Sequence, residues 1–329
     1  MPDLYDVAAV GNAIVDVIAP CDDAFLADNG LDKGAMMLVD AEQSAALYAK
    51  MQAGLEASGG SAGNTIAGVA SFGGKAAYLG KVADDKLGQV FAHDMRAVGA
   101  HFDTPPLVGG KATAVSMINV TPDGQRTMCT FLGASVEFTD ADVDKDVIEG
   151  AGIAYLEGYL FDAEPARRAF AKTAALAHGA GRMIALTLSD GFVVERHRAA
   201  LMGFIEGQVD LLFANESEVC ALYQTDDFDK AVERLRPHVK LAAVTRGPAG
   251  SVILSQGERL SVRAEPVEKV VDTTGAGDQY AAGFMFGLSR GRPLQQCGRL
   301  ASLAAAEVIS HYGPRPQVSL KDLAASKGY

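Results

Sequence analysis

The residues best suited to chemistry stand in one short string, DTTGAGD at Asp272–Asp278. Apolar residues at helical spacing follow it and predict a helix that begins at about Gly275. The first N–H groups of a helix lack partners within it, and glycines let a charged ligand approach them closely. Such an end binds phosphate oxygens, and the Asp278 carboxylate in its first turn suits the proton of an attacking hydroxyl. The string therefore favours phosphoryl transfer over an ordinary capped helix start.

A second candidate, Asp16, lies in an otherwise apolar segment, GNAIVDVIA. A charge in such a strand is costly unless it is paired or faces a cleft. Asp16 is therefore a candidate ligand-binding carboxylate, with Asn12 as a weaker neighbour. The alternative, a solvent-facing position on an edge strand, stays open at this point.

The glycine cluster GGSAGN at Gly59–Asn64 allows two interpretations. As GxSxG it matches the nucleophile elbow of serine hydrolases, with Ser61 as the nucleophile. That motif needs a buried strand just before the serine, whereas the preceding YAKMQAGLEAS is helix-like and polar. The other interpretation uses the glycines for close approach to a ligand and Asn64 as a hydrogen-bonding side chain. The hydrolase remains a minor alternative.

Two further pairs follow predicted strands. Asn215 and Glu218 have the spacing of a helix cap with a carboxylate at the third helical position, a capping box. Thr245 and Gly247 belong to VTRG, just after another strand. Both pairs also stand where a parallel sheet binds its ligands, at the carboxyl ends of the strands.

The elements that must position these residues form an α/β pattern. From Ile153 onward, apolar runs alternate with amphipathic helical stretches, which indicates a mostly parallel sheet covered by helices on both faces. The N-terminal third contains two β patches instead, the second a hairpin turning near Pro122–Gly124. We expect one domain over residues 1–329, with a small β-sheet lid from about 13–40 and 111–134.

Composition narrows the function. The 329 residues carry a net charge of −12, so nucleic acid is not an expected partner. The chain lacks an apolar run long enough to span a bilayer and a basic, uninterrupted apolar leader. Its four cysteines are scattered, as is typical of reduced thiols. These features predict a cytoplasmic protein with no membrane partner. They leave open whether it is a monomer or a homodimer.

Taken together, these strings resemble the ribokinase-like (PfkB) family of carbohydrate and nucleoside kinases. The resemblance runs along the whole chain, and within the family it is greatest to adenosine kinases. It implies an ATP-dependent kinase acting on the 5′-hydroxyl of adenosine, with Mg²⁺ as the cofactor and K⁺ as a further candidate. Another nucleoside or a sugar such as ribose or fructose remains an alternative acceptor, and a non-catalytic nucleotide sensor is an alternative of another class. The strings that carry the resemblance are GNAIVD, GGSAGN, FANESE, VTRG and DTTGAGD.

The resemblance also implies roles for individual residues. Asp278 would be the catalytic base, and the amides of Gly275, Ala276 and Gly277 would form the anion hole. The expected acceptor-binding residues are Asn12, Asp16, Gly60, Asn64 and Arg126, with Met36, Met37, Leu38, Leu132 and Tyr159 as candidates for an apolar base pocket. The expected ATP-binding residues are Asn215, Glu218, Thr245 and Gly247. Glu218 would reach the metal through water, and Asp272 with Thr274 would form a monovalent cation site. No direct protein ligand is assigned to Mg²⁺.

Overall fold

A computed structural model of the protein describes residues 4–255 and 257–329. Its larger sheet has eight strands in the order β13-β12-β11-β10-β9-β8-β1-β5. The strands from β5 to β11 in that order run parallel, and the last two pair antiparallel as the expected hairpin. The strands are β1 (Tyr5–Val10), β5 (Ala76–Leu79), β8 (Ala151–Glu157), β9 (Met183–Thr187), β10 (Leu211–Asn215), β11 (Leu241–Thr245), β12 (Ser251–Ser255) and β13 (Glu258–Val262).

Both faces of this sheet are covered by helices, which is why its central strands are nearly continuous apolar runs. One face packs against α5 (Lys145–Glu149), α6 (Glu164–Gly179), α7 (Gly191–Gln208), α8 (Glu216–Tyr223) and α9 (Phe228–Leu235). The other face packs mainly against α3 (Ser61–Ser71), α4 (Lys86–Ala97), α10 (Ala276–Ser289) and α11 (Leu294–Val308), and α12 (Leu320–Ser326) lies on α11 and α3.

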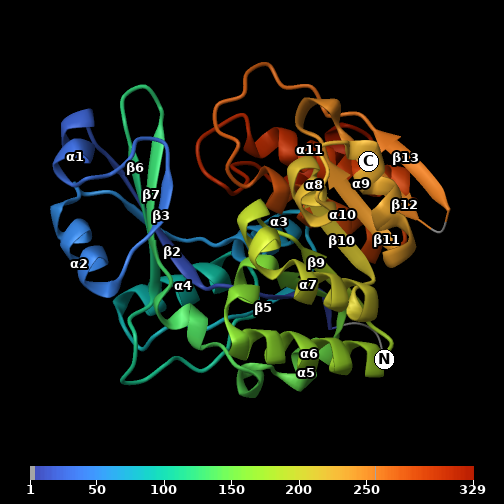
Figure 1. Ribbon diagram of the computed structural model, residues 1–329, viewed down its shortest axis with the longest axis horizontal. Helices are drawn as coiled ribbons and strands as arrows, with labels where there is room; N and C mark the ends of the chain where they lie inside the picture. Colours follow the sequence, from blue (N-terminus) through green and yellow to red (C-terminus); the bar gives the residue numbers. More distant parts are fainter. Residues whose placement is uncertain (1–3, 256) are drawn as a thin grey trace.

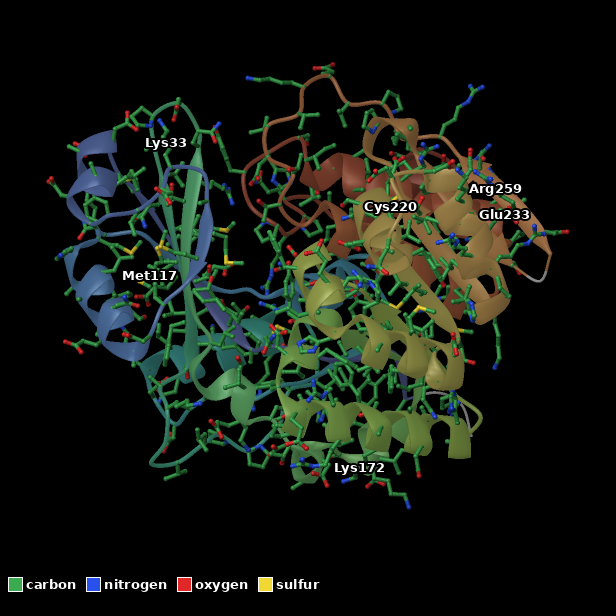
Figure 2. All side chains as sticks on the ribbon, viewed as in Figure 1. Lys33, Met117, Lys172, Cys220, Glu233 and Arg259 are labelled. Carbon is green, nitrogen blue, oxygen red and sulfur yellow. The ribbon has the colours of Figure 1, made fainter. Side chains whose placement is uncertain are left out.

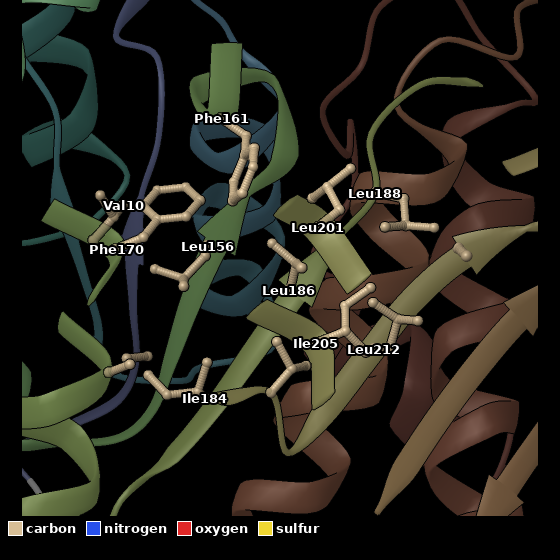
Figure 3. Close-up of a cluster of buried hydrophobic side chains, with 14 of the residues drawn as sticks. Val10, Leu156, Phe161, Phe170, Ile184, Leu186, Leu188, Leu201, Ile205 and Leu212 are labelled. Carbon is tan, nitrogen blue, oxygen red and sulfur yellow. The ribbon is translucent and has the colours of Figure 1, made fainter. Parts of the chain in front are cut away.

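The first of these faces holds a core of interlocking side chains (Figure 3). Leu156 of β8, Leu186 of β9 and Leu212 of β10 meet Ile205 of α7 and Phe170 of α6, and all are fully buried. Burying a Leu, Ile or Phe side chain contributes about 1.5–3 kcal/mol. This core therefore holds the ends of the strands firmly in place.

The smaller sheet has five strands in the order β3-β7-β6-β2-β4 and stands at one side of the molecule (Figure 1). One face packs on α1 (Asp23–Asp28) and α2 (Ala41–Lys50) through side chains such as Met117 (Figure 2), and the other face turns toward the larger sheet. Its strands are β2 (Ile14–Pro20), β3 (Met36–Leu38), β4 (Leu55–Ser58), β6 (Ala114–Val120) and β7 (Arg126–Phe131).

The fold class is the expected one, with two differences in the N-terminal third. The segment GNAIVDVIA follows straight on from β1 of the larger sheet and continues as β2 of the smaller one, so the chain changes sheet at Gly11–Ala13. The stretch before Ser61 is not helical throughout, because α2 ends at Lys50 and β4 follows. β4 pairs antiparallel with β2 at the edge of the small sheet, where exposed and polar residues are tolerated.

The hairpin predicted to turn near Pro122–Gly124 is present in the small sheet. β6 and β7 pair antiparallel, and the turn between them closes with a hydrogen bond from Thr121 N to Gln125 O and a positive φ at Gly124. Within the described residues, no helix combines the length and apolar character needed to cross a membrane.

Candidate active site

A cavity of about 670 Å³ lies between the inner face of the small sheet and the carboxyl ends of the larger sheet. It brings together most of the residues singled out in the sequence. Its walls include Asn12, Asp16, Met36, Gly60, Asn64, Tyr159, Asn215, Glu218, Thr245 and Gly275–Asp278. Arg126, Gly247 and Asp272 lie outside these walls, and Gly247 borders a neighbouring cavity that shares Asn215 and Thr245.

The floor of the cavity is the start of α10. Gly275 is the N-cap residue in the left-handed conformation (φ +81°), and a Cβ there would stand 2.6 Å from the Pro314 backbone, so the position requires glycine. No described side chain caps this helix end. Its first amide groups are therefore available to an anion in the cavity, and the positive end of the helix dipole adds to the attraction.

Asp278 lies in the first turn of α10 and is held by two donors. Ser61 Oγ donates to its Oδ1 at 2.6 Å, and Asn64 Nδ2 donates to its Oδ2 at 3.2 Å. Burial raises the pKa of Asp278 to about 6, while these two hydrogen bonds act in the opposite direction. The carboxylate is thus mostly ionised at neutral pH yet close enough to neutrality to take up a proton, as a general base requires.

The contacts of Ser61 argue against the serine hydrolase. Its hydroxyl donates to a carboxylate and it opens α3 just after an edge strand of the small sheet. A nucleophile elbow would instead place the serine at a sharp turn between a strand of the main sheet and a helix, beside a histidine base. Ser61 thus orients Asp278.

Asp16 reaches the cavity from β2. Burial raises its pKa to about 7, the charges of Arg315 and Arg126 lower it, and the charge of Asp278 raises it. The glycines of GGSAGN approach this strand closely, since a Cβ on Gly59 would stand 2.3 Å from the Asp16 carboxyl group. The lack of a side chain at Gly59 therefore lets the glycine segment pack directly against Asp16. The Asp16 carboxylate remains in the wall of the cavity.

A carboxylate that sequence reasoning missed, Glu157, holds this region together. It ends β8, is almost fully buried, and accepts hydrogen bonds from Asn12 Nδ2 (3.0 Å) and from the backbone N–H of Ala62 (2.8 Å). Burial raises its pKa to about 7, partly offset by these bonds. The Oδ1 atom of Asn12 is buried without a partner among the described residues, so it is a free acceptor at the cavity wall. The sequence does contain one indication of Glu157, because it is an acidic residue at the end of the apolar run IAYLE.

On the opposite side of the cavity, Asn215 and Glu218 make the expected capping box. Asn215 Oδ1 accepts from Glu218 N at 2.8 Å, and the Glu218 carboxylate accepts from Asn215 N and Nδ2 at 3.0 and 2.7 Å. Glu218 is only 6% exposed, and burial raises its pKa to about 7. The pair therefore both caps α8 and presents a fixed carboxylate to the cavity.

Arg126 lies outside the cavity wall and pairs with Asp272 in the loop before α10. Its Nη2 atom is 2.7 Å from Asp272 Oδ2, and both side chains are at most one-tenth exposed. Asp272 also accepts from Thr274 N and Oγ1 and from Gly313 N. Arg126 Nε and Nη1 are buried without a hydrogen-bond partner among the described residues. The proposed cation site at Asp272 and Thr274 has its carboxylate already paired with the Arg126 guanidinium.

The apolar wall comes from alternate residues of the small sheet. Met36 and Leu38 of β3 and Met128 of β7 face the cavity, joined by Leu132 and by Tyr159 from the other side. Met37 packs on the opposite face, so its inclusion in the base pocket was wrong. The reason is the two-residue period of a strand, which a run of three apolar residues hides.

Most of the chain matches a known protein family. The model of the pfkB family carbohydrate kinases matches residues 32–320. The chain belongs to this family. It is therefore a kinase that phosphorylates hydroxyl groups of nucleosides or sugars, with ATP as the phosphoryl donor that the family implies.

Three relatives show how this PfkB kinase compares with known proteins. The adenosine kinase structure from Sinorhizobium meliloti is 54% identical, with 98% of this chain and 99% of that chain covered and a TM-score of 0.91. A probable sugar kinase from Rhizobium etli CFN 42 is 51% identical over 99% of both chains, with a TM-score of 0.92. The adenosine kinase of Saccharomyces cerevisiae is 28% identical over 94% of this chain and 96% of its own length.

A metal ion in this PfkB kinase would bind at the walls of the cavity. Among the described residues, no group of three or more His, Cys, Asp or Glu side chains is arranged to hold a metal ion. Mg²⁺ commonly keeps several waters and binds through phosphates and one or two carboxylates. Glu218, an oriented carboxylate at the cavity wall, fits that mode through water.

Proposed function

We propose that this PfkB kinase transfers the γ-phosphoryl group of ATP to the 5′-hydroxyl of adenosine, giving AMP and ADP. The observation that carries the proposal is one cavity with Asp278 and the start of α10 at one end and the apolar wall of the small sheet at the other. A nucleoside needs both ends, because the 5′-hydroxyl of its ribose must reach the Asp278 carboxylate and its flat purine needs apolar contacts. The 54% identity to an adenosine kinase supports the same acceptor.

The acceptor's ribose would be held by polar groups at the middle of the cavity. Asp16 accepts hydrogen bonds from ribose hydroxyls, and the free Oδ1 of Asn12 accepts another. Gly60 allows the chain to pass close by, since its φ of +79° is open to glycine. Met36 and Tyr159 cover the base. In this arrangement the 5′-hydroxyl points toward Asp278.

The transfer step then uses the start of α10. Asp278 accepts the proton of the 5′-hydroxyl as the oxygen attacks the γ-phosphorus, and ADP leaves on the opposite side. The amides of Gly275, Ala276 and Gly277 stabilise the charge on the transferred group. Asn215, Glu218 and Thr245 border this cavity and Gly247 borders the neighbouring one, which supports a nucleotide site along these residues.

Mg²⁺, when bound, offsets charge on the ATP phosphates, and Glu218 would hold it through water. A potassium site at Asp272 and Thr274 does not fit the same way, because Arg126 already neutralises the Asp272 carboxylate. We therefore derive no step through K⁺. The small sheet acts as a lid in this scheme, excluding water that would compete as the acceptor.

A sugar kinase is the second candidate, favoured by the 51% identity to a probable sugar kinase. The test is a panel of adenosine, other nucleosides, ribose and fructose, each with ATP and Mg²⁺, followed by ADP release and product identification. We expect adenosine to have the highest kcat/KM. A far higher kcat/KM for ribose or fructose would contradict the nucleoside assignment. ADP release that is the same with and without every acceptor would indicate a weak ATPase or a nucleotide sensor.

A further inference from the structure

The loop that follows α11 makes contacts that the proposed mechanism has not used. Gly313 N donates to Asp272, and Pro314 O accepts from Gln279 Nε2 in the first turns of α10. Pro314 also packs against Gly275 at the floor of the cavity. The next residue, Arg315, is therefore carried to the junction between the phosphate end and the acceptor end of the cavity.

Arg315 contacts Asn64 there. Its Nε atom donates to Asn64 Oδ1 at 3.3 Å, and its Nη2 atom lies 3.9 Å from Met95 Sδ on α4. A guanidinium has donors only. The Asn64 amide must therefore turn its oxygen toward Arg315, and its NH2 group then faces Asp278, where Nδ2 donates to Oδ2 at 3.2 Å.

We propose that Arg315 is a positioning residue for phosphoryl transfer, which acts by fixing the orientation of the Asn64 amide toward Asp278. The proposal rests on the role of Asp278 as the base. Without the guanidinium, the amide is free to rotate by half a turn. Its oxygen would then face the Asp278 carboxylate, and one of the two donors that hold the base would be replaced by a repulsive contact.

The charges around this junction support the same role. Arg315 faces Asp16 on β2 and Asp94 on α4, and Tyr78 on β5 lies near it. Its charge lowers the pKa of Asp16 against the effect of burial, whereas Asp278 raises it. Asp278 itself is faced by Ser61 and Asn64, whose hydrogen bonds lower its pKa. Loss of Arg315 should therefore move both carboxylates toward their neutral forms.

The first experiment compares Arg315→Met and Arg315→Lys with the parent enzyme. Arg315→Met should reduce kcat with the preferred acceptor by roughly 10- to 100-fold, the effect of one charge-assisted hydrogen bond. KM for ATP should change less than about twofold, since Arg315 does not border the nucleotide side. The acidic limb of the kcat profile should move to higher pH. Arg315→Lys keeps the charge and should restore part of kcat and of the pH profile.

The matched control is Arg290→Met, which removes a remote ion pair with Asp6. It should lower thermal stability and leave the pH profile unchanged, so it separates stability from positioning. If Arg315→Met does not fold in a thermal melt, Arg315→Lys carries the test, because a mobile ammonium does not reproduce the planar donor fork. A kcat and acidic limb equal to the parent in the folded variant would overturn the proposal.

A double-mutant cycle with Asn64→Ala tests the route of the effect. If Arg315 acts on turnover through Asn64, adding Arg315→Met to Asn64→Ala should change kcat by less than about twofold. Multiplied effects would overturn the proposal. Asp278→Asn is measured in parallel, because its near-parental turnover would remove the base and with it the proposed function. An inactive Asp278→Asn beside a fully active Arg315→Met would remove only the role of Arg315.

Discussion

The anion site and the base at the start of α10 come from one stretch of chain, whereas the acceptor end of the cavity is gathered from separate stretches. The loop and first turn at Asp272–Asp278 supply the anion site and the base together. Asp16, Asn64, Glu157 and Arg315 come instead from β2, α3, β8 and the loop after α11. This local device, the anion site and base of Asp272–Asp278, can therefore be recognised in a short string, whereas the acceptor end depends on tertiary contacts.

The strongest way to test the local device is Asp278→Asn. The substitution keeps the size of the side chain but removes the proton acceptor, so kcat should fall by roughly 10²–10⁴-fold. The fold should survive, because Asn is tolerated at a helix start. Turnover of the preferred acceptor is measured beside a thermal melt, and Asp227→Asn, at the start of the remote helix α9, serves as the control.

A well-folded Asp278→Asn enzyme that keeps more than about a tenth of the parental kcat would fall outside the range for loss of a general base. The residue would then be part of the helix start only, and the comparison between the two ends would lose its chemical basis.

The acceptor end is tested by Asp16→Ala. Hydrogen bonds to a charged group contribute about 1.5–3 kcal/mol, so acceptor binding should weaken by roughly 10- to 150-fold. KM for ATP should stay nearly constant. Asp123→Ala, at the hairpin turn of the same sheet, is the matched control and should leave both constants unchanged. Parental acceptor kcat and KM in the Asp16 variant would remove Asp16 from the site.

The smallest expected effect concerns the pH dependence of stability through Glu157. Its folded pKa, about 7, lies above the ordinary glutamate value, so the folded state binds more protons than the unfolded state between about pH 4.5 and 7. Its contribution to stability is thus largest below pH 4.5 and is lost as the pH rises through 7. Thermal melts from pH 5 to 8 should show a smaller fall in Tm for Glu157→Gln than for the parent. Parallel curves would show that Glu157 does not titrate in this range.

The same contrast explains what the sequence could predict. The start of α10 at Gly275, the β6–β7 hairpin and the parallel sheet follow from local patterns, and the structure has each of them. Ala62, which donates to Glu157, is 95 residues away from it in the chain, and Asn64 is 251 residues away from Arg315. The local spacing of residues therefore could not predict these contacts. β4 was missed because a four-residue edge strand has too short an apolar alternation to separate from a helix end. The pairing of Arg126 with Asp272 is likewise a tertiary contact, which no local pattern predicts.

The alternation of side chains on the small sheet has a consequence for how such enzymes diversify. Met36, Leu38 and Met128 face the cavity, while Met117 and Cys129 on the same sheet form the core with α1 and α2. The cavity-facing residues can therefore be replaced one at a time, and the range of acceptors can change with them. Such replacements affect neither the core that stabilises the sheet nor the phosphoryl-transfer chemistry at α10.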